Sequence, residues 1–346
     1  MPATCTETTT FTCSNCHRER PLSQACLTGT DTRVCFDCFD RHYTRCAGCG
    51  ELVLREAVDS TSNYYAPRTI DGDVYCWACS CYRQTDYGTE ETVCWRPIPM
   101  ASPIASYDEI GSTRKYGVEI ETSECPRYER LRGNTHFGAK PDCTVDGLEF
   151  DSPVLYGDEG LAEIRKFLEF ADEHDWAVDD NCGCHTHYDM RGESDESLAR
   201  IAYAYRICVT MLEALVDPSR VNGEYCGMPR YSLREIRQAF STPAYIGCDF
   251  RYWCEGTPRY TYVNLYAIDT HNTFEIRILE GSIDAELICN WIKFNARFMD
   301  WAKTQTFDDL DTLFSGKSPA EMVDIAGNAA GMNAWLRQRF THCQNM

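Results

Sequence analysis

The sequence predicts an α+β domain preceded by a small cysteine-rich domain. The chain has 346 residues and 43% hydrophobic content, enough for a large core and about two domains. Twelve of its 22 cysteines lie in residues 1–95. Beyond residue 113, strand and helix patterns are interspersed without a regular βαβ repeat, which favours the α+β class. We therefore expect a cysteine-rich domain at 1–95, a proline-rich linker at 96–112 and an α+β domain at 113–346.

The net charge and the first residues of the chain indicate which classes of partner and which cellular compartment to expect. The net charge of −20 disfavours nucleic acid and anionic membranes as partners. No stretch approaches the roughly 20 apolar residues of a membrane span. The opening Met1-Pro-Ala-Thr has neither a basic nor an apolar signal region, so we expect a reducing, cytoplasmic location.

Four Cys-x-x-Cys pairs predict two zinc sites in the cysteine-rich domain. Such a turn presents two thiolates about 3.5–4 Å apart, which fits two corners of a tetrahedral zinc ion. Taken in order, the pairs enclose loops of 18 and 26 residues. The expected ligands are Cys13, Cys16, Cys35 and Cys38 for one ion and Cys46, Cys49, Cys76 and Cys79 for the other.

The flanking residues refine this interpretation and leave alternatives. Cys46-Ala-Gly-Cys-Gly50 resembles a zinc knuckle, and Asp73-Val-Tyr-Cys-Trp-Ala-Cys79 resembles the closing half of a treble-clef finger, so the tandem is similar to LIM-type modules. A crossed pairing, Cys81 in place of Cys79, and an iron–sulfur cluster remain open, whereas redox-active dithiols fit four such pairs poorly. Residues 1–95 hold 8 basic and 13 acidic side chains, which favours a protein-binding or structural module over a DNA-reading finger.

Hydrophobic periodicity predicts the elements of the second domain in order. Strands are expected at 116–121, 148–153, around 182–187, near 260–267 and at 273–279. Helices are expected at about 158–174, from Ser194 to Pro218, at 232–240 and at about 284–303. The stretch 123–147 is rich in turn residues.

Three of the expected strands carry pairs of polar residues at positions i and i+2. The pairs are Glu119 and Glu121, His185 and His187, and Glu275 and Arg277. Because a strand puts i and i+2 on one side, each strand can direct two polar side chains into one cavity. Carboxylates and imidazoles suit divalent metals, and arginine suits phosphate. One such pair is more often a solvated strand face, but three together favour phosphoryl transfer from a nucleotide.

The order of five motifs resembles the amidoligase family, which belongs with glutamine synthetase and glutamate–cysteine ligase. The motifs are Gly-Val-Glu-Ile-Glu, Asp-x-Thr followed by Glu-Phe-Asp-Ser-Pro, Cys-Gly-x-His-x-His, Arg-Tyr-x-x-Val-Asn and Phe-Glu-Ile-Arg. The resemblance covers residues 115–303 and implies a glutamine synthetase-like curved antiparallel sheet with flanking helices. It also implies ATP and two or three Mg²⁺ or Mn²⁺ ions. ATP would phosphorylate a carboxylate, and an amine would then attack the acyl phosphate.

The resemblance also assigns residues by motif. Glu119, His185 and Glu275 would hold the metal that faces the nucleotide phosphates, and Glu121 and Glu149 the metal nearer the acyl group. His187 would lie by the nucleotide phosphates. Arg277 and Arg259 would neutralise phosphate oxygens or bind a substrate carboxylate. No Walker-type glycine-rich loop is present, so the nucleotide must bind in another way.

Several roles stay open at this level. Asp142 and Asp146 are candidates for the base that deprotonates the amine, although turn residues often lie at the surface. Cys182 and Cys184 are expected to be core residues, since free cysteine is commonly buried. Arg220 and Tyr225 fit a substrate pocket and a helix-end surface equally well.

Three functions compete. The first is an ATP-dependent carboxylate–amine ligase acting on a peptide, protein or small amine or carboxylate substrate, recruited in part by the zinc module. The second is a metal-dependent hydrolase, which would act without nucleotide and leave Arg277 less to do. The third is a non-enzymatic zinc-finger adaptor, which the intact set of polar residues argues against. The sequence does not identify the acid substrate, the amine substrate or the oligomeric state.

Overall fold

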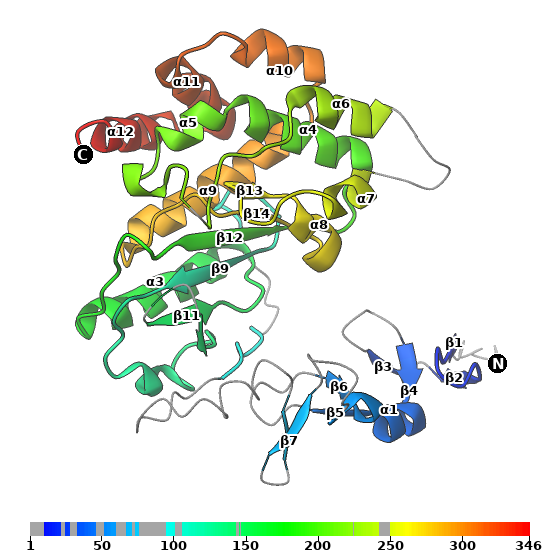
Figure 1. Ribbon diagram of the computed structural model, residues 1–346. Coiled ribbons are helices and arrows are strands. Elements are labelled where there is room, and N and C mark those ends of the chain that lie inside the picture. The colour runs from blue at the N-terminus through cyan, green and yellow to red at the C-terminus, as the bar shows by residue number, and fades with distance from the viewer. Residues whose placement is uncertain are drawn as a thin grey trace, which may run out of the picture. The chain divides into compact units, whose positions relative to one another are not determined.

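The computed structural model describes residues 10–21, 25–27, 33–45, 52–59, 67–70, 73–75, 95–100, 106–142, 145, 147–223, 225–241 and 250–346. The chain divides into two compact units, Met1–Arg96 and Pro97–Met346 (Figure 1). Within the described residues, no helix combines the length and the apolar character needed to cross a membrane.

The first unit is built from short antiparallel hairpins. The pairs are β1 (Thr10–Thr12) with β2 (Glu19–Pro21), β3 (Ala25–Leu27) with β4 (Arg33–Cys35), β5 (Tyr43–Arg45) with β6 (Leu52–Leu54), and β7 (Arg68–Ile70) with β8 (Asp73–Tyr75). Helix α1 (Phe36–His42) follows β4, and the 3-10 helix η2 (Arg55–Ala57) follows β6. Phe11, Val34 and three cysteines form a buried cluster. So small a cluster stabilises a fold weakly, which is why modules of this size use metals or disulfides.

The second unit is an α+β domain around a six-stranded antiparallel sheet, as predicted. The strand order is β10 (Lys140–Pro141), β11 (Leu148–Asp151), β9 (Tyr116–Glu121), β12 (Cys184–Asp189), β14 (Thr273–Ile276) and β13 (Val263–Asn264). The predicted strand near 260–267 shrinks to the two residues of β13. Tyr266 and Ala267 instead begin a helix, because the chain must turn back within a few residues to start β14.

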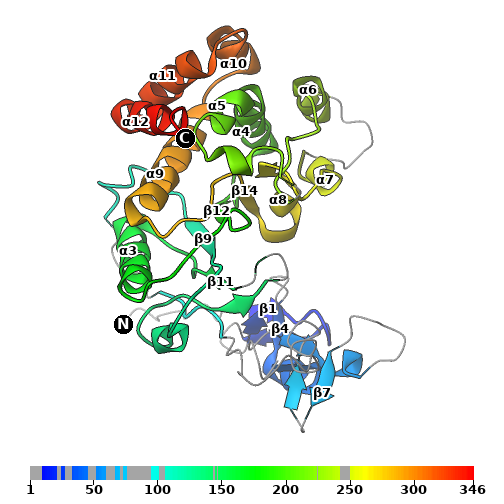
Figure 2. The same ribbon diagram turned by 60° about the vertical axis from the view of Figure 1, so that its left-hand side comes forward.

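Helices cover one face of this sheet. The face carries alternate apolar residues such as Ile120, Phe150 and Phe274, all fully buried. Phe150 packs on Phe167 of α3 (Gly157–Glu173), and Phe274 packs on Tyr205 of α4 (Asp195–Ile207). Helix α9 (Ala285–Ala302) packs on α3 on the same side of the sheet (Figure 2). The opposite face is therefore left for polar side chains.

The remaining helices differ in part from the expectation. They are α5 (Val209–Glu213), α6 (Leu233–Ser241), α7 (Phe250–Glu255), α8 (Tyr266–His271), α10 (Phe307–Phe314), α11 (Pro319–Ala330) and α12 (Asn333–Cys343), with 3-10 turns η3 (Tyr128–Leu131) and η4 (Pro218–Arg220). The long helix predicted after Ser194 is two helices, since the backbone at Cys208 leaves helical geometry between β-branched Ile207 and Val209.

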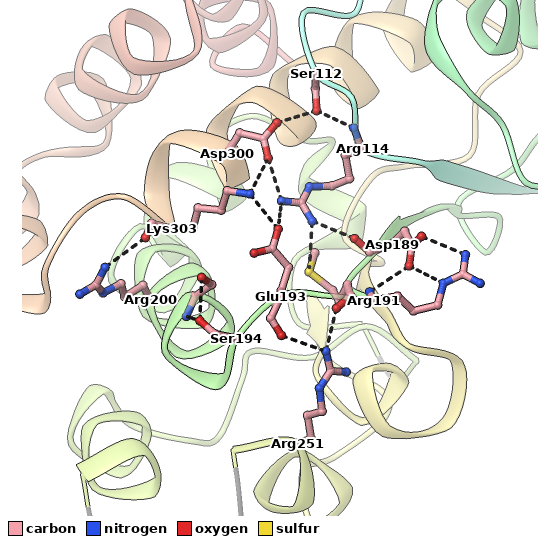
Figure 3. A network of polar contacts seen from close by, with 12 residues as sticks. Ser112, Arg114, Asp189, Arg191, Glu193, Ser194, Arg200, Arg251, Asp300 and Lys303 are labelled. Carbon is pink, nitrogen blue, oxygen red and sulfur yellow. Dashed lines mark hydrogen bonds and ion pairs between the residues drawn. The ribbon is translucent and has the colours of Figure 1, made fainter. Parts of the chain in front are cut away.

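An ion network around the buried Arg114 ties the start of β9 to the end of α9 (Figure 3). The Arg114 side chain is 4% exposed and donates to Glu193 Oε1 at 2.9 Å and to Asp300 Oδ1 at 2.7 Å. It also donates to the carbonyl of Asp189, the last residue of β12, at 2.8 Å. Lys303 Nζ lies 2.9 Å from Glu193 Oε1. Arg114 therefore fixes two neighbouring strand ends against α9.

The segment that precedes this network also packs on the second unit. Asp158 of α3 accepts hydrogen bonds from the backbone N–H groups of Glu109 and Ile110. Arg165 donates to Glu109, and Arg297 donates to the carbonyl of Ile110 at 2.7 Å. Residues 106–112, within the expected linker, thus lie against α3 and α9.

Candidate active site on the polar face of the sheet

Strand register brings the predicted polar pairs together on the open face. Directly paired residues of antiparallel strands point to the same side. Glu149 pairs with Glu121, Asp151 with Glu119, and Glu119 with His185. One row further along, His187 pairs with Glu275, which pairs with Asn264. Residues from five strands therefore share a single surface.

The side chains in these rows are in close contact. His185 Nδ1 lies 3.2 Å from Glu119 Oε2, and His185 Nε2 lies 3.7 Å from Glu121 Oε1. His187 Nε2 lies 3.4 Å from the other oxygen of Glu119 and 3.9 Å from Glu275 Oε1. Glu121, His185 and Glu275 are buried and Glu119 is half-buried. The i, i+2 pairs of the sequence thus form one cluster.

Three groups of side chains in the described part of this unit have the geometry to hold a metal ion. They are Glu119, His185 and Glu275; Glu119, Glu149 and Asp151; and Glu121, Asp142 and Glu149. In each group, one ligand atom per residue lies within 4.8 Å of the others. Glu119 and Glu149 each belong to two groups, so the cluster has the form of neighbouring cation sites that share bridging carboxylates.

The sequence interpretation missed Asp151, although its signal was present. Asp151 stands two residues after Glu149 in Glu-Phe-Asp and so shares its face. Asp142, considered above as a base, lies among the acidic side chains. Asp146, the other candidate base, lies outside the described residues.

The pKa shifts show how the carboxylates respond to this crowding. Burial opposes ionisation of Glu119, but His187 and His185 hold its pKa well below the usual value. Burial opposes the charge on His187, yet Glu119 raises the pKa of that imidazole. Burial and the charge of Glu119 raise the pKa of Glu149 to about 10. The acidic end of the cluster therefore lacks positive charge.

Lys140 on the edge strand β10 supplies part of that charge. Its Nζ lies 2.8 Å from Glu149 Oε1 and 2.9 Å from Asp151 Oδ2. Burial opposes the charge on this lysine, but Glu149 and Asp151 raise its pKa. No sequence pattern selected Lys140, because only the pairing of β10 with β11 places it beside Glu149.

The donor set fits a hard divalent cation. Oxygens with one imidazole suit Mg²⁺ or Mn²⁺. The Oδ1 atoms of Asp151 and Asn264 are buried and, among the described residues, have no hydrogen-bond partner. Such atoms are stabilised by a cation or its bound water.

The two predicted arginines take different positions. Arg277 donates to Glu275 Oε1 at 2.5 Å, and Asn264 Nδ2 donates to the other oxygen of Glu275 at 2.6 Å. Arg277 thus belongs to the cluster. Arg259 is exposed and lies over the ring of Tyr260, 5.6 Å from its centroid. Arg277 lies over the same Tyr260 ring, 5.8 Å from its centroid, so this ring contacts both arginines.

Arg220 is a buried member of the site rather than a surface residue at a helix end. It is 8% exposed and donates to the carbonyl of Arg277 at 3.1 Å. A Cβ atom added at Gly183 would lie 2.6 Å from Arg220 Nη2 and 2.9 Å from His185 Nε2. Tyr225, in contrast, is 46% exposed and packs edge-on against Tyr260.

The two cysteines beside the histidines are core residues. Cys182 and Cys184 are fully buried, and burial raises the pKa of both thiols. Cys184 pairs with Ile120 on the apolar face. The packing interpretation is confirmed for both.

In the first unit, one predicted zinc tetrad comes together. The sulfur atoms of Cys13, Cys16, Cys35 and Cys38 lie within 4.8 Å of one another. The Cys16 and Cys35 sulfurs are 3.9 Å apart, close to the roughly 3.8 Å edge of a tetrahedron with Zn–S bonds of about 2.3 Å. Burial disfavours the Cys13 thiolate, but N–H groups of Cys16, Cys35 and Asn15 lower its pKa to about 6. The residues fit a zinc ion.

This tetrad decides the pairing of the first two motifs. The first Cys-x-x-Cys pair meets the second, so the crossed arrangement of first with third is wrong. The second predicted set, Cys46, Cys49, Cys76 and Cys79, and its alternative Cys81 lie outside the described residues.

Comparison with protein families gives a match over much of the second unit. The family model described as "Putative amidoligase enzyme" matches residues 126–299, about half of the chain. The matched range holds Glu149, His185, His187, Arg259, Glu275 and Arg277. It begins after β9, so Glu119 and Glu121 lie outside it. A comparison with curated proteins gives no match.

Proposed function

The chain belongs to the amidoligase family, and on that premise we propose that it is an ATP-dependent carboxylate–amine ligase. One observation supports this most strongly. The register of β9, β11, β12 and β14 gathers five carboxylates, two histidines and an arginine on one face. Phosphoryl transfer requires such positioning and charge neutralisation more than covalent participation by the protein.

The proposed reaction has two steps. A carboxylate oxygen of the acid attacks the γ-phosphorus of ATP, and ADP leaves, which forms an acyl phosphate. The amine nitrogen then attacks the acyl carbon, phosphate leaves, and the nitrogen loses a proton. Divalent cations held by the three acidic groups would neutralise the phosphate oxygens during transfer.

The chain's own residues position the reactants and carry charge. Arg277 is held by Glu275, and Arg220 by the carbonyl of Arg277, so both guanidinium groups have fixed positions beside the carboxylates. His187, whose pKa is raised by Glu119, adds positive charge near the phosphates. We assign acceptance of the amine proton to Asp142, which lies with Glu121 and Glu149.

The substrate proposed is a peptide, protein or amino-acid-derived acid or amine. The Cys13–Cys38 tetrad, with zinc bound, would keep the first unit folded so that it can recruit this substrate. The negative net charge of the chain disfavours a nucleic acid in this role.

A first experiment tests nucleotide and metal binding directly. Calorimetry should detect ATP binding that requires Mg²⁺ or Mn²⁺, with elemental analysis for zinc on the same sample. Glu119→Ala and Glu275→Ala should lose ATP binding, whereas Glu169→Ala, on the exposed side of α3, should not. Unchanged binding in Glu119→Ala would remove that residue from the site.

A second experiment tests the reaction class. Hydroxylamine replaces the amine and traps an acyl phosphate as a hydroxamate, so acids can be screened with one colour reaction. ADP formation that depends on an added acid, together with hydroxamate, would support the ligase. Cleavage of substrates without nucleotide would favour the hydrolase, and zinc without any nucleotide affinity would favour the adaptor.

A further inference from the structure

A pocket of about 360 Å³ opens on the polar face at the Lys115 end of β9. Its lining includes Lys115, Gly117, Glu119, His187 and His271. This volume falls within the roughly 300–1,000 Å³ of small-molecule sites. We infer that the pocket holds the nucleoside part of ATP, with Gly117 as its floor and the phosphates directed toward Glu119 and His187. The inference rests on the proposed function and deepens it.

Gly117 is the first argument. Its position pairs with His187 across the sheet, so a side chain there would stand on the polar face inside the pocket. A Cβ atom would meet only Ser152 Oγ at 3.5 Å and the carbonyl of Pro153 at 4.0 Å, both ordinary contacts. Protein packing therefore does not require glycine at this position. A bare backbone here leaves room for a flat ligand against the strand.

Charge is the second argument. Two of the pocket's carboxylates are already paired, since Asp189 accepts from Arg191 at 2.8 Å and Asp151 binds Lys140 at 2.9 Å. Lys115 also lines the pocket, and its ammonium lies 5.1 Å from the centroid of the Tyr156 ring. Glu119 belongs to two of the metal-capable groups. With a cation bound there, the pocket attracts a polyanion more than an amine.

His271 adds an uncharged wall. Burial and the neighbouring His187 lower the pKa of His271, so its ring is neutral at pH 7. A neutral imidazole can accept or donate a hydrogen bond to a base without competing for phosphate. The uncharged His271 ring thus lines the same pocket as the charged Glu119 and His187.

This arrangement places ATP and the two reacting groups, the acid and the amine, at different ends of β9. From Lys115 to Glu121 the strand spans about 20 Å. The nucleoside lies at the first end and the γ-phosphate near Glu119. The acid and the amine then approach from the other end, where Glu121, Glu149 and Arg220 lie.

Substitutions at Gly117 test this placement in the full chain. Gly117→Ala, Gly117→Val and Gly117→Leu should weaken ATP binding progressively, with Gly117→Leu about tenfold to a hundredfold weaker. Binding of Mg²⁺–tripolyphosphate, which lacks the nucleoside, and of Mn²⁺ alone should stay within about twofold. Gly256→Ala, whose added Cβ would meet only a carbonyl at 3.6 Å, is the control for folding.

Each other outcome overturns the inference in a recognisable way. Unchanged ATP affinity in Gly117→Leu would place the nucleoside elsewhere and leave the proposed function intact. Equal loss of ATP and tripolyphosphate binding would show that the pocket holds phosphates only. Spermine serves as a probe for amines. If Gly117→Leu lost spermine binding and retained ATP binding, the pocket would be an amine site. No ATP binding by the unmodified chain would reject the proposed function and this placement together.

Discussion

Glu149 shows most clearly what the acidic cluster lacks. It lies opposite Glu121 and two residues from Asp151, and its pKa rises to about 10 from 4.5. An acid with a raised pKa binds a proton more tightly in the folded state, so stability falls as pH rises from about 4.5 toward 10. At pH 7 the metal-free protein is therefore destabilised by this carboxyl group.

Glu149→Gln should raise the stability of the metal-free protein. A neutral amide needs no proton on folding, so the variant should gain on the order of 1–3 kcal/mol at pH 7, or about 2–4 °C in Tm per kcal/mol. Saturating Mn²⁺ should raise the Tm of the unmodified chain and do little for the variant. Scanning calorimetry with and without Mn²⁺ checks both results. A lower Tm of Glu149→Gln in chelator would contradict this account.

His187 should make stability fall with rising pH as well, through the loss of a favourable ion pair. Its pKa is raised by Glu119, so its ion pair contributes fully below about 6.5 and is lost as pH rises through the raised pKa. The pKa of Glu119 is lowered, so the same pair is lost at the acid end as pH falls through that value.

The metal-free chain should therefore be more stable than His187→Gln near pH 6, and the difference should shrink toward pH 9. Thermal unfolding in chelator between pH 5 and 9 measures this. A difference in Tm that stays constant across the range would show that His187 acts by packing alone.

At the scale of elements, the start of β12 depends on Gly183. This residue lies beside Arg220 and His185, with no room for a side chain. Its N–H donates to Glu121 Oε2 at 2.6 Å. One backbone position thus sets the distance between a histidine, a glutamate and an arginine.

Gly183→Ala should displace Arg220 or His185 and weaken Mn²⁺ binding by about tenfold to a hundredfold, as disturbed outer-shell partners do. Gly223→Ala is the matched control, because its added Cβ would lie no closer than 3.8 Å to another atom. Calorimetric titration of both variants gives the comparison. Equal Mn²⁺ affinity in the two would show that the close approach at Gly183 is not needed.

The Arg114 network acts between elements and should be a stability determinant. Arg114→Met leaves Glu193 and Asp300 with Lys303 as their cation and should cost about 3 kcal/mol. Arg337→Met, which removes an exposed pair with Asp324, should cost less than about 1 kcal/mol. Urea unfolding measures both, and similar costs would contradict the role of burial.

At the scale of the molecule, the two units are each stabilised by a different kind of interaction. The second has an apolar face covered by three helices, whereas the first has a small cluster around the Cys13–Cys38 tetrad. Burial of apolar side chains supplies most of the stability of a domain such as the second unit. In a small cysteine-rich module such as the first unit, metal binding contributes directly to folding.

Zinc removal should accordingly unfold the first unit and spare the second. Cys13→Ser should lower the zinc content by about one ion per chain, the capacity of one tetrad, and a strong zinc chelator should remove that ion as well. The thermal transition of the second unit should stay in place. A common loss of both transitions would show that the units fold as one.

Several features followed from local pattern and several did not. Alternation in Tyr116–Glu121 and Cys184–Asp189 predicted both strands and the side chains that meet. Lys140 carried no local signal, because its partner Glu149 is 9 residues away on another strand. The sequence left two roles open for Arg220, because the contact that decides between them is 57 residues away. Tyr266–His271 is helical despite the β-favouring Tyr266, Ile268 and Thr270, since the turn into β14 overrides propensity.

The sequence by itself determined the α+β class and the polar faces of β9, β12 and β14, because these depend on spacing within one segment. Only the tertiary structure decided that the first Cys-x-x-Cys pair meets the second. It also decided that Glu149 and Asp151 join Glu119, that Lys140 neutralises them, and that Gly117 opens a pocket. Those facts depend on register between strands, and a shift of one residue would send every such side chain to the opposite face.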